Sequence, residues 1–225
     1  MNKRIAAIYE KITPGVGVID VGTDHGYLPA ALAAGGYPGR ILASDINPGP
    51  LQAAERTAVR AGVADKIEFQ LCDGLALCPP EAVDTIVIAG MGGDSIVKIL
   101  DEAEWCMDSR YRLILQPMTK AEVVRYWLAY NEFEIISETL VQDAGTLYQI
   151  LTARFGGHTA LTDAELFIGK ASLAEDPTLY RLALEGFAER LAKAVAGLRG
   201  REEGSARRKL YVEIMEQVRE LKKKL

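Results

Sequence analysis

The sequence is poor in the side chains that bind metals or form disulfides, with three cysteines and two histidines in 225 residues. Cys72, Cys78 and Cys106 form no C-x-x-C pair, and their spacing matches no zinc-binding pattern. We therefore expect no metal. Unpaired thiols are typical of a cytoplasmic protein, where they pack as small apolar side chains.

Long apolar runs are also missing. A membrane-spanning helix needs about 20 predominantly apolar residues, and no stretch approaches that length. The opening MNKRIAAIYEKI becomes charged again too soon for a signal peptide. With 49% hydrophobic and 25% charged residues, the composition is that of a folded soluble protein. We expect a cytoplasmic monomer or weak dimer that binds no membrane.

The sequence also lacks an excess of positive charge. The net charge of −5 gives no overall attraction for nucleic acid. The charge is uneven, however: residues 1–161 hold 13 Lys+Arg against 20 Asp+Glu, and residues 162–225 hold 13 against 11. A bound polyanion would find most of its countercharge in the last quarter of the chain. Solvated helix faces explain this bias equally well.

The first 155 residues alternate β-rich runs with helical patterns. Near-continuous apolar strands separated by helices predict a parallel sheet covered on both faces. Two last β-rich runs, 133–144 and 146–156, flank a tight turn with a glycine and predict an antiparallel hairpin, which completes a seven-stranded Rossmann-like α/β sheet. The other predicted strands are 17–21, 40–44, 66–70, 83–89 and 111–116, and the predicted helices are 27–35, 48–61, 94–104, 119–130 and a short N-terminal helix.

A different region follows, so we predict two domains, 1–157 and 158–225. Thr162 and Glu165 have the spacing of a capping box that starts a helix, and Asp176-Pro177 is expected to break it. Apolar residues then recur at spacings of 4 and 3 from Tyr180 to Leu198, and a second apolar stripe follows after a glycine-containing break. These patterns predict an antiparallel coiled-coil hairpin.

The stretch DVGTDHGY, residues 20–27, resembles a dinucleotide-binding turn but contains an acid at Asp24. A strand followed by Gly-x-x-x-Gly and a helix presents backbone N–H groups to a ligand. Asp24 would repel the pyrophosphate that such turns bind in NAD enzymes. S-adenosylmethionine fits better, since it carries a sulfonium and an ammonium group and no phosphate. The alternative is that Asp24 only caps the following helix.

Two further acids follow predicted strands. Asp45, 23 residues after Gly22, can accept hydrogen bonds from both hydroxyls of an adenosine ribose. Asp73 is placed to accept from the adenine amino group, and Gly74 allows close approach. The alternative for Asp73 is an ordinary surface turn.

The stretch IAGMGGDSI, residues 88–96, is predicted to follow the fourth strand, where open α/β sheets bind substrate. Its glycines let the backbone approach the donor methyl group, and Met91 offers an apolar wall. Asp94 is expected to cap the next helix. Gln116, which closes the fifth strand, could touch the target.

The motifs DVGTDHGYLP, SDIN, CDGL, IAGMGG and LQP, in this order and with a C-terminal helical hairpin, resemble the bacterial TrmK family over essentially the whole chain. That family consists of S-adenosylmethionine-dependent tRNA (adenine(22)-N1)-methyltransferases. The resemblance implies a class I methyltransferase fold, S-adenosyl-L-methionine as cofactor and tRNA as substrate. The implied cofactor contacts are Asp20, Gly22, Asp24, His25, Gly26, Tyr27, Leu28, Asp45, Ile46, Asp73, Gly74, Ala89, Gly90, Met91 and Gly92.

Adenine N1 is already a nucleophile, so the protein must mainly align it with the methyl group and the sulfur. Asp24 and Met91 are the candidate catalytic residues, with Asp24 stabilising the positive charge that arrives on the purine. His25, Tyr27 and Met91 could stack on the extruded base, or could equally be core or helix-cap residues. Besides Gln116, the predicted tRNA contacts are Lys3, Arg4, Arg199, Arg201, Arg207, Arg208 and Lys209, although a solvated hairpin tip explains the C-terminal group as well.

Two rival functions stay open. A small-molecule methyltransferase of this fold would use the helical hairpin as a lid or dimer contact. A non-catalytic adenosine-binding module would act through the hairpin as an interaction protein. A dehydrogenase is disfavoured by Asp24 and by the antiparallel last strands.

Overall fold

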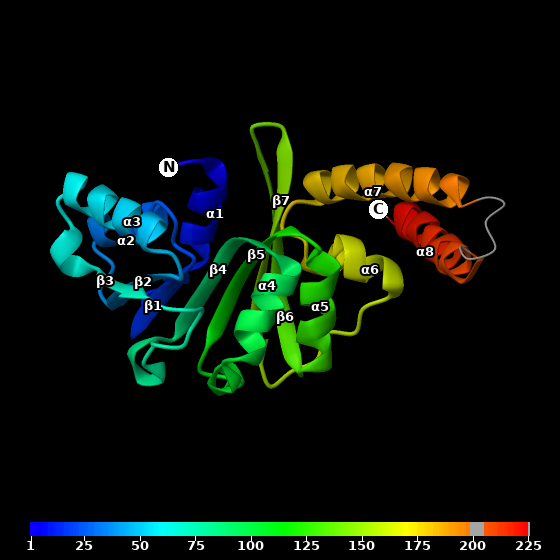
Figure 1. Ribbon diagram of the computed structural model, residues 1–225. Helices are drawn as coiled ribbons and strands as arrows, with labels where there is room; N and C mark the ends of the chain where they lie inside the picture. The colour runs from blue at the N-terminus through cyan, green and yellow to red at the C-terminus, as the bar shows by residue number, and fades with distance from the viewer. Residues whose placement is uncertain (199–204, 225) are drawn as a thin grey trace.

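A computed structural model describes residues 1–198 and 205–224, and its centre is one seven-stranded sheet (Figure 1). The strand order is β3-β2-β1-β4-β5-β7-β6. Neighbours among β1 to β5 run parallel, whereas β7 runs antiparallel to both β5 and β6, which confirms the predicted Rossmann-like sheet. The strands are β1 (Gly17–Val21), β2 (Arg40–Asp45), β3 (Glu68–Leu71), β4 (Thr85–Gly92), β5 (Arg112–Thr119), β6 (Phe133–Asp143) and β7 (Thr146–Phe155).

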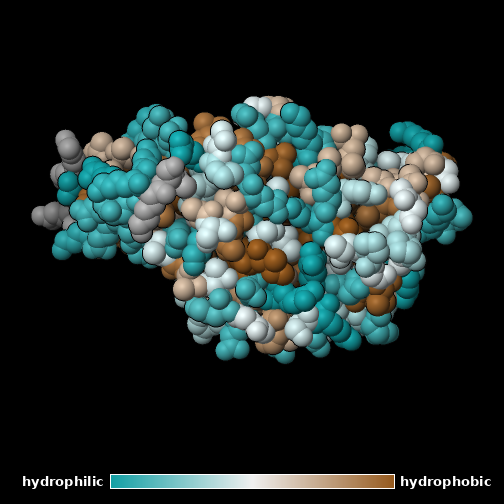
Figure 2. Space-filling model, turned by 180° about the vertical axis from the view of Figure 1, so that it is seen from behind, coloured by the Kyte–Doolittle hydropathy of each residue, from teal (hydrophilic) through white to brown (hydrophobic). Residues whose placement is uncertain are grey.

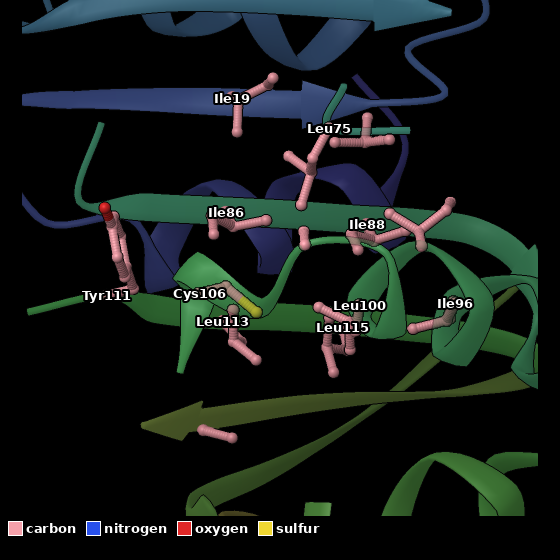
Figure 3. Close-up of a cluster of buried hydrophobic side chains, with 14 of the residues drawn as sticks. Ile19, Leu75, Ile86, Ile88, Ile96, Leu100, Cys106, Tyr111, Leu113 and Leu115 are labelled. Carbon is pink, nitrogen blue, oxygen red and sulfur yellow. The ribbon is translucent and has the colours of Figure 1, made fainter. Parts of the chain in front are cut away.

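Helices cover both faces of the sheet, which is why its central strands are apolar without alternation. Strand side chains such as Ile86 and Leu113 point toward Leu100 of α4 on one face (Figure 3). Ile8 of α1 and Leu28 of α2 pack on the other face. The helices are α1 (Lys3–Lys11), α2 (Tyr27–Ala34), α3 (Pro48–Arg60), α4 (Gly93–Asp101), α5 (Ala121–Tyr130), α6 (Asp163–Ile168), α7 (Pro177–Gly197) and α8 (Ser205–Lys224), with 3₁₀ turns η1 (Ala64–Lys66), η2 (Pro80–Ala82), η3 (Glu104–Cys106) and η4 (Ala171–Leu173).

The fourth strand is longer than the sequence predicts. It continues to Gly92, so most of the glycine-rich stretch belongs to β4 and not to a loop after it. Its pairing with β5 shifts register on both sides of Met91, and Gly90 has a φ of 79°. Such an irregularity bends a strand and redirects its side chains. The irregularity lies beside the candidate site described below.

The helical region begins with the predicted capping box, in which Thr162 and Glu165 bond reciprocally. The predicted break at Asp176-Pro177 is wrong for this helix, because α6 already ends before Gly169, whose φ is 83°. Asp176 instead caps α7, accepting from the N–H groups of Thr178 and Leu179, with proline in the first turn.

Helices α7 and α8 pack together as the predicted hairpin, at the end of the molecule opposite β3 (Figure 1). The predicted 4-3 spacing is observed in the buried residues Tyr180, Leu184 and Leu191. The next buried residue is Val195 and not Ala194. A straight helix of 3.6 residues per turn drifts away from a strict 4-3 repeat, which accounts for this change. From behind, hydrophilic residues cover most of this end (Figure 2).

A buried ion pair joins the helical region to the sheet. Arg125 of α5 is fully buried and donates to Glu138 of β6 over 2.6 and 3.1 Å. Its remaining guanidinium nitrogen donates to the Leu166 carbonyl of α6 over 2.9 Å. The other Glu138 oxygen accepts from the Lys170 N–H over 3.1 Å. The predicted boundary near residue 158 falls between β7 and α6.

Within residues 1–198 and 205–224, no helix combines the length and the apolar character that a membrane crossing requires.

Candidate functional site

A hollow of about 360 Å³ opens where β1, β2 and β4 end. This is the sheet edge at which open α/β folds bind ligands, and the volume lies within the usual range of about 300–1,000 Å³. The lining residues are Val21, Gly22, Ser44, Asp45, Ile46, Asn47, Cys72, Asp73, Gly74, Met91, Ser95, Lys98 and Ile99. Six predicted cofactor contacts are therefore together in one place: Gly22, Asp45, Ile46, Asp73, Gly74 and Met91.

The turn after β1 forms one wall of this hollow. The N–H groups of Gly22 and Thr23 donate to the Ser44 carbonyl over 2.8 and 2.9 Å, which ties the turn to β2. Gly22 has a φ of 68°, and a Cβ there would collide with the terminal methyl group of Met91. Glycine thus suits the left-handed backbone of the turn, and it leaves room for the flexible end of the Met91 side chain.

Asp20 lies beneath the turn and not in the hollow's lining. It is 7% exposed, and its carboxyl group accepts from the Thr23 hydroxyl over 2.7 Å. Burial raises the pKa of Asp20 to about 7, although the Thr23 hydrogen bond and the charge of Arg4 oppose that rise. Asp20 therefore supports the turn from below.

The two acids of the hollow come from the ends of neighbouring strands. Asp45 is 8% exposed and accepts from the Asn47 N–H over 2.9 Å, so its carboxylate is held in place. Asp73 stands 3.8 Å from the Lys98 ammonium, and both side chains are about half exposed. Carboxylates at these positions suit the hydroxyl and amino groups of an adenosine.

The acid of the turn, Asp24, lies at an exposed rim. Its φ of 51° puts it in the left-handed region, and its carboxylate is 3.7 Å from His25 Nε2. The His25 and Tyr27 rings stack with centroids 5.6 Å apart. Gly26 occupies the N-cap of α2 and no side chain bonds there, so the interpretation of Asp24 as the helix cap is wrong. None of these side chains is among the lining residues.

Helix α1 reaches the end of β4, beside the site. Arg4 donates to the Gln116 side-chain oxygen over 2.6 Å, and the same oxygen accepts from the Gly90 N–H over 3.2 Å. Gln116 is fully buried, so the expectation that it touches the target is corrected: its amide links α1 to the irregular part of β4. Lys3 is exposed on the first turn of α1.

Several other predicted residues lie elsewhere than expected. Leu28 is 2% exposed and packs in the core, because the first turn of α2 directs it toward the sheet. Ala89 also packs against that core, while Gly90 and Gly92 flank Met91 outside the lining. Asp94 does not cap α4, whose N-cap is Gly92, but pairs with Lys120.

The predicted basic tip is only partly described. Arg207, Arg208 and Lys209 are exposed on the first turns of α8, at the end of the molecule away from the hollow. Arg199 and Arg201 lie outside the described residues.

Some lining residues escaped prediction. Ser44, Asn47 and Cys72 stand within or beside the motifs SDIN and CDGL, which could have signalled them. Ser95, Lys98 and Ile99 come from one face of α4, with the i, i+3, i+4 spacing of a helix. Nothing in their local sequence shows that this face borders the hollow. In the described part of the chain, no group of three or more His, Cys, Asp or Glu side chains could hold a metal ion.

The sheet order, the antiparallel last hairpin and the hollow at the strand ends define the class of the protein as a Rossmann-like methyltransferase. Residues 1–151 match the family model described as a methyltransferase domain. The tRNA (adenine(22)-N1)-methyltransferase of Bacillus subtilis is 32% identical over 163 residues, which are 72% of this chain and 68% of that protein. The chain belongs to the TrmK family of tRNA (adenine(22)-N1)-methyltransferases.

Solved structures agree over the whole length. The B. subtilis M1A22 tRNA methyltransferase TrmK covers 98% of this chain and is itself 97% covered, with a TM-score of 0.83 and 26% identity. Streptococcus pneumoniae Sp1610 in complex with S-adenosyl-L-methionine covers 98% of this chain and is itself 98% covered, with a TM-score of 0.83 and 29% identity. Both include the helical hairpin, since the matches extend well past residue 157.

Proposed function

We propose that this chain transfers a methyl group from S-adenosyl-L-methionine to N1 of adenine 22 in tRNA. Membership of the TrmK family supports this function. The observation that carries it is the charge of the hollow's lining: two carboxylates, Asp45 and Asp73, lie at the ends of neighbouring strands, with Lys98 next to Asp73. Such a site favours an adenosine with a cationic sulfur over a pyrophosphate.

The lining residues fit this cofactor. Asp45 would accept from the ribose hydroxyls and Asp73 from the adenine amino group, with Ile46 as an apolar wall. The bound cofactor supplies an electrophilic methyl group. The turn at Gly22 and the end of β4 at Met91 would align the acceptor base with that group, at a separation of roughly 3 Å.

The rim is suited to the base. Extrusion of an adenine from its stack costs a few kcal/mol, which stacking on the exposed His25–Tyr27 pair would offset. Asp24, beside that pair, would stabilise the positive charge that methylation places on the purine. We assign Asp24 to the acceptor side of the site because it is exposed and outside the lining.

The test is transfer of label from S-adenosyl-L-methionine to unmodified tRNA. We expect label in the tRNA, and none when adenine 22 is replaced by guanine. Label that persists after this replacement would contradict adenine 22 as the methylated nucleotide. Cofactor binding without transfer to any RNA would favour a non-catalytic adenosine-binding module. Transfer only to small molecules would favour a small-molecule methyltransferase.

Docking of tRNA is proposed to use phosphate contacts at the start of α8. Replacing Arg207, Arg208 and Lys209 by alanine should weaken tRNA binding and flatten its salt dependence, because each lost phosphate contact reduces counterion release. Cofactor affinity should not change. A triple replacement of Arg56, Arg60 and Lys66, exposed at the other end of the molecule, is the control. An equal salt slope in both variants would reject this docking surface.

A tRNA substrate also supports a cytoplasmic location. We propose that the chain acts as a monomer or weak dimer.

A further inference from the structure

A second hollow lies in the helical region, apart from the candidate methyl-transfer site. It has a volume of about 150 Å³ and is formed where α6, α7 and α8 meet. The residues used below are Phe167, Phe187, Arg190, Leu191, Ala194 and Tyr211. This volume is well below the usual range for a whole cofactor, so the hollow suits a single ring system.

The walls of this hollow are aromatic. Phe167 of α6 and Phe187 of α7 have nearly parallel rings with centroids 5.3 Å apart and planes inclined by 20°. Tyr211 of α8 adds a third ring, and all three are only half-buried. An unpaired base can stack on partly exposed flat rings of this kind, whichever of the four bases it is.

The charges beside the hollow are all positive on α7 and α8. Side chains three or four residues apart share a helix face. At that spacing from the lining residues, α7 carries Arg190 and Lys193, and α8 carries Arg207 and Arg208. All four are exposed. Among the described residues of α7 and α8, no acid stands at that spacing, since Glu185 and Glu189 belong to other faces of α7. On α6, Asp163 stands four residues before Phe167.

Acidic side chains gather at another place on α6 and α8. A separate hollow between α6 and α8 is lined by Glu165, Glu213, Glu216 and Glu220. Cations stand beside these acids, since Lys223 pairs with Glu220 over 2.6 Å, and Arg219 and Lys222 line the adjoining hollow. The described cations at the aromatic hollow have no acid of α7 or α8 at helical spacing, so a phosphate backbone is attracted more strongly there.

We propose that the aromatic hollow binds one unpaired base of the tRNA, whose flanking phosphates contact Arg190, Lys193, Arg207 and Arg208. This inference rests on the proposed function, since it takes tRNA as the substrate. The aromatic hollow would give this acidic protein a local docking site, with positive charge beside it, far from the methyl-transfer hollow. Phosphate contacts would orient the RNA, and stacking would hold one base.

The test fills the hollow without removing charge. Ala194 is half-buried in the lining, so Ala194→Phe would place a ring where the base would lie. Ala192→Phe, two residues earlier on the exposed face of α7, is the matched control. Ala194→Phe should weaken tRNA binding roughly 5- to 150-fold, the range expected for one stacked base. Cofactor affinity should stay as in the wild type.

Ultraviolet cross-linking of the wild-type complex gives a readout without catalysis. We expect a cross-linked nucleotide at Tyr211 or Phe187 and none in the Ala194→Phe variant. Wild-type tRNA affinity in Ala194→Phe, or cross-links confined to the methyl-transfer site, would overturn the inference while leaving the proposed function intact. A change in oligomeric mass in that variant without a loss of tRNA affinity would also overturn it, and would assign the hollow to self-association. Failure of the wild type to methylate tRNA would instead reject the proposed function.

Discussion

At the scale of single residues, a substitution of Asp24 distinguishes a role in catalysis from a role in cofactor binding. Asparagine tolerates the left-handed backbone of this position, so Asp24→Asn should keep the turn and remove only the charge. We expect a single-turnover rate at least about 10-fold lower, because the carboxylate no longer stabilises the developing cation, with cofactor affinity within about 2-fold. Calorimetry and quenched-flow transfer measure the two effects.

Asp65→Asn, on an exposed turn remote from the hollow, is the control and should change neither quantity. Weaker cofactor binding in Asp24→Asn with an unchanged single-turnover rate would move Asp24 to the cofactor side.

Asp20 makes stability depend on pH. Its pKa is raised by burial from 3.8 to about 7, so the unfolded chain loses this proton at lower pH than the folded protein. The stability contributed by the neutral carboxyl group is therefore full below about pH 4 and is lost as the pH rises through 7. The free energy of unfolding of the wild type should fall relative to Asp20→Asn over this window, by at most about 4 kcal/mol at about 1.4 kcal/mol per pKa unit.

Urea unfolding of both proteins from pH 4 to 8 measures this difference. Asparagine keeps an acceptor for the Thr23 hydroxyl, so the comparison isolates the ionisation. A difference between the two proteins that does not vary with pH would contradict the raised pKa.

At the scale of elements, Gly26 sets how closely α2 begins against α3. A Cβ on Gly26 would lie 2.7 Å from the Cβ and 2.8 Å from the Cα of Ala54, so the helices would have to separate. Gly62 has almost the same φ, 69° against 67°, but no atom within 4 Å. Gly62→Ala should cost about 1–2 kcal/mol from the left-handed backbone alone. Gly26→Ala should cost about 1–3 kcal/mol more, from the overpacking.

Chemical denaturation of the two variants measures the comparison. Equal losses would show that the contact between α2 and α3 adds nothing to the backbone strain.

At the scale of the whole molecule, the Arg125–Glu138 pair connects the sheet to the helical region. Glu138→Ala should cost about 3–5 kcal/mol, because it leaves the fully buried guanidinium without its countercharge and the Lys170 N–H without its acceptor. Glu68→Ala is the matched control: it breaks the Arg40–Glu68 pair, whose two bonds are 2.7 and 2.9 Å but whose side chains are about half exposed. That loss should be about 0–1 kcal/mol.

Thermal or urea unfolding gives both values. A cost for Glu138→Ala no larger than that for Glu68→Ala would contradict the structural role of the buried pair.

Much of this molecule could be predicted because its signals are local. The apolar runs of β1 and β4, the capping box at Thr162 and the glycine turn between β6 and β7 each lie within a few residues. The end of β4 could not be predicted in this way. Glycines are typical of loops, and only the pairing with β5 extends the strand to Gly92.

By itself, the sequence determined the order and type of the elements, and which acids follow which strands, because periodicity and turn chemistry act over short windows. Only the tertiary structure decided which of the candidate residues share a hollow. It placed Lys98 in the lining and Leu28 in the core, buried Gln116 under Arg4, and brought aromatic side chains of α6, α7 and α8 together in a second hollow. These outcomes depend on contacts between residues far apart in the chain, on which a local pattern carries no information.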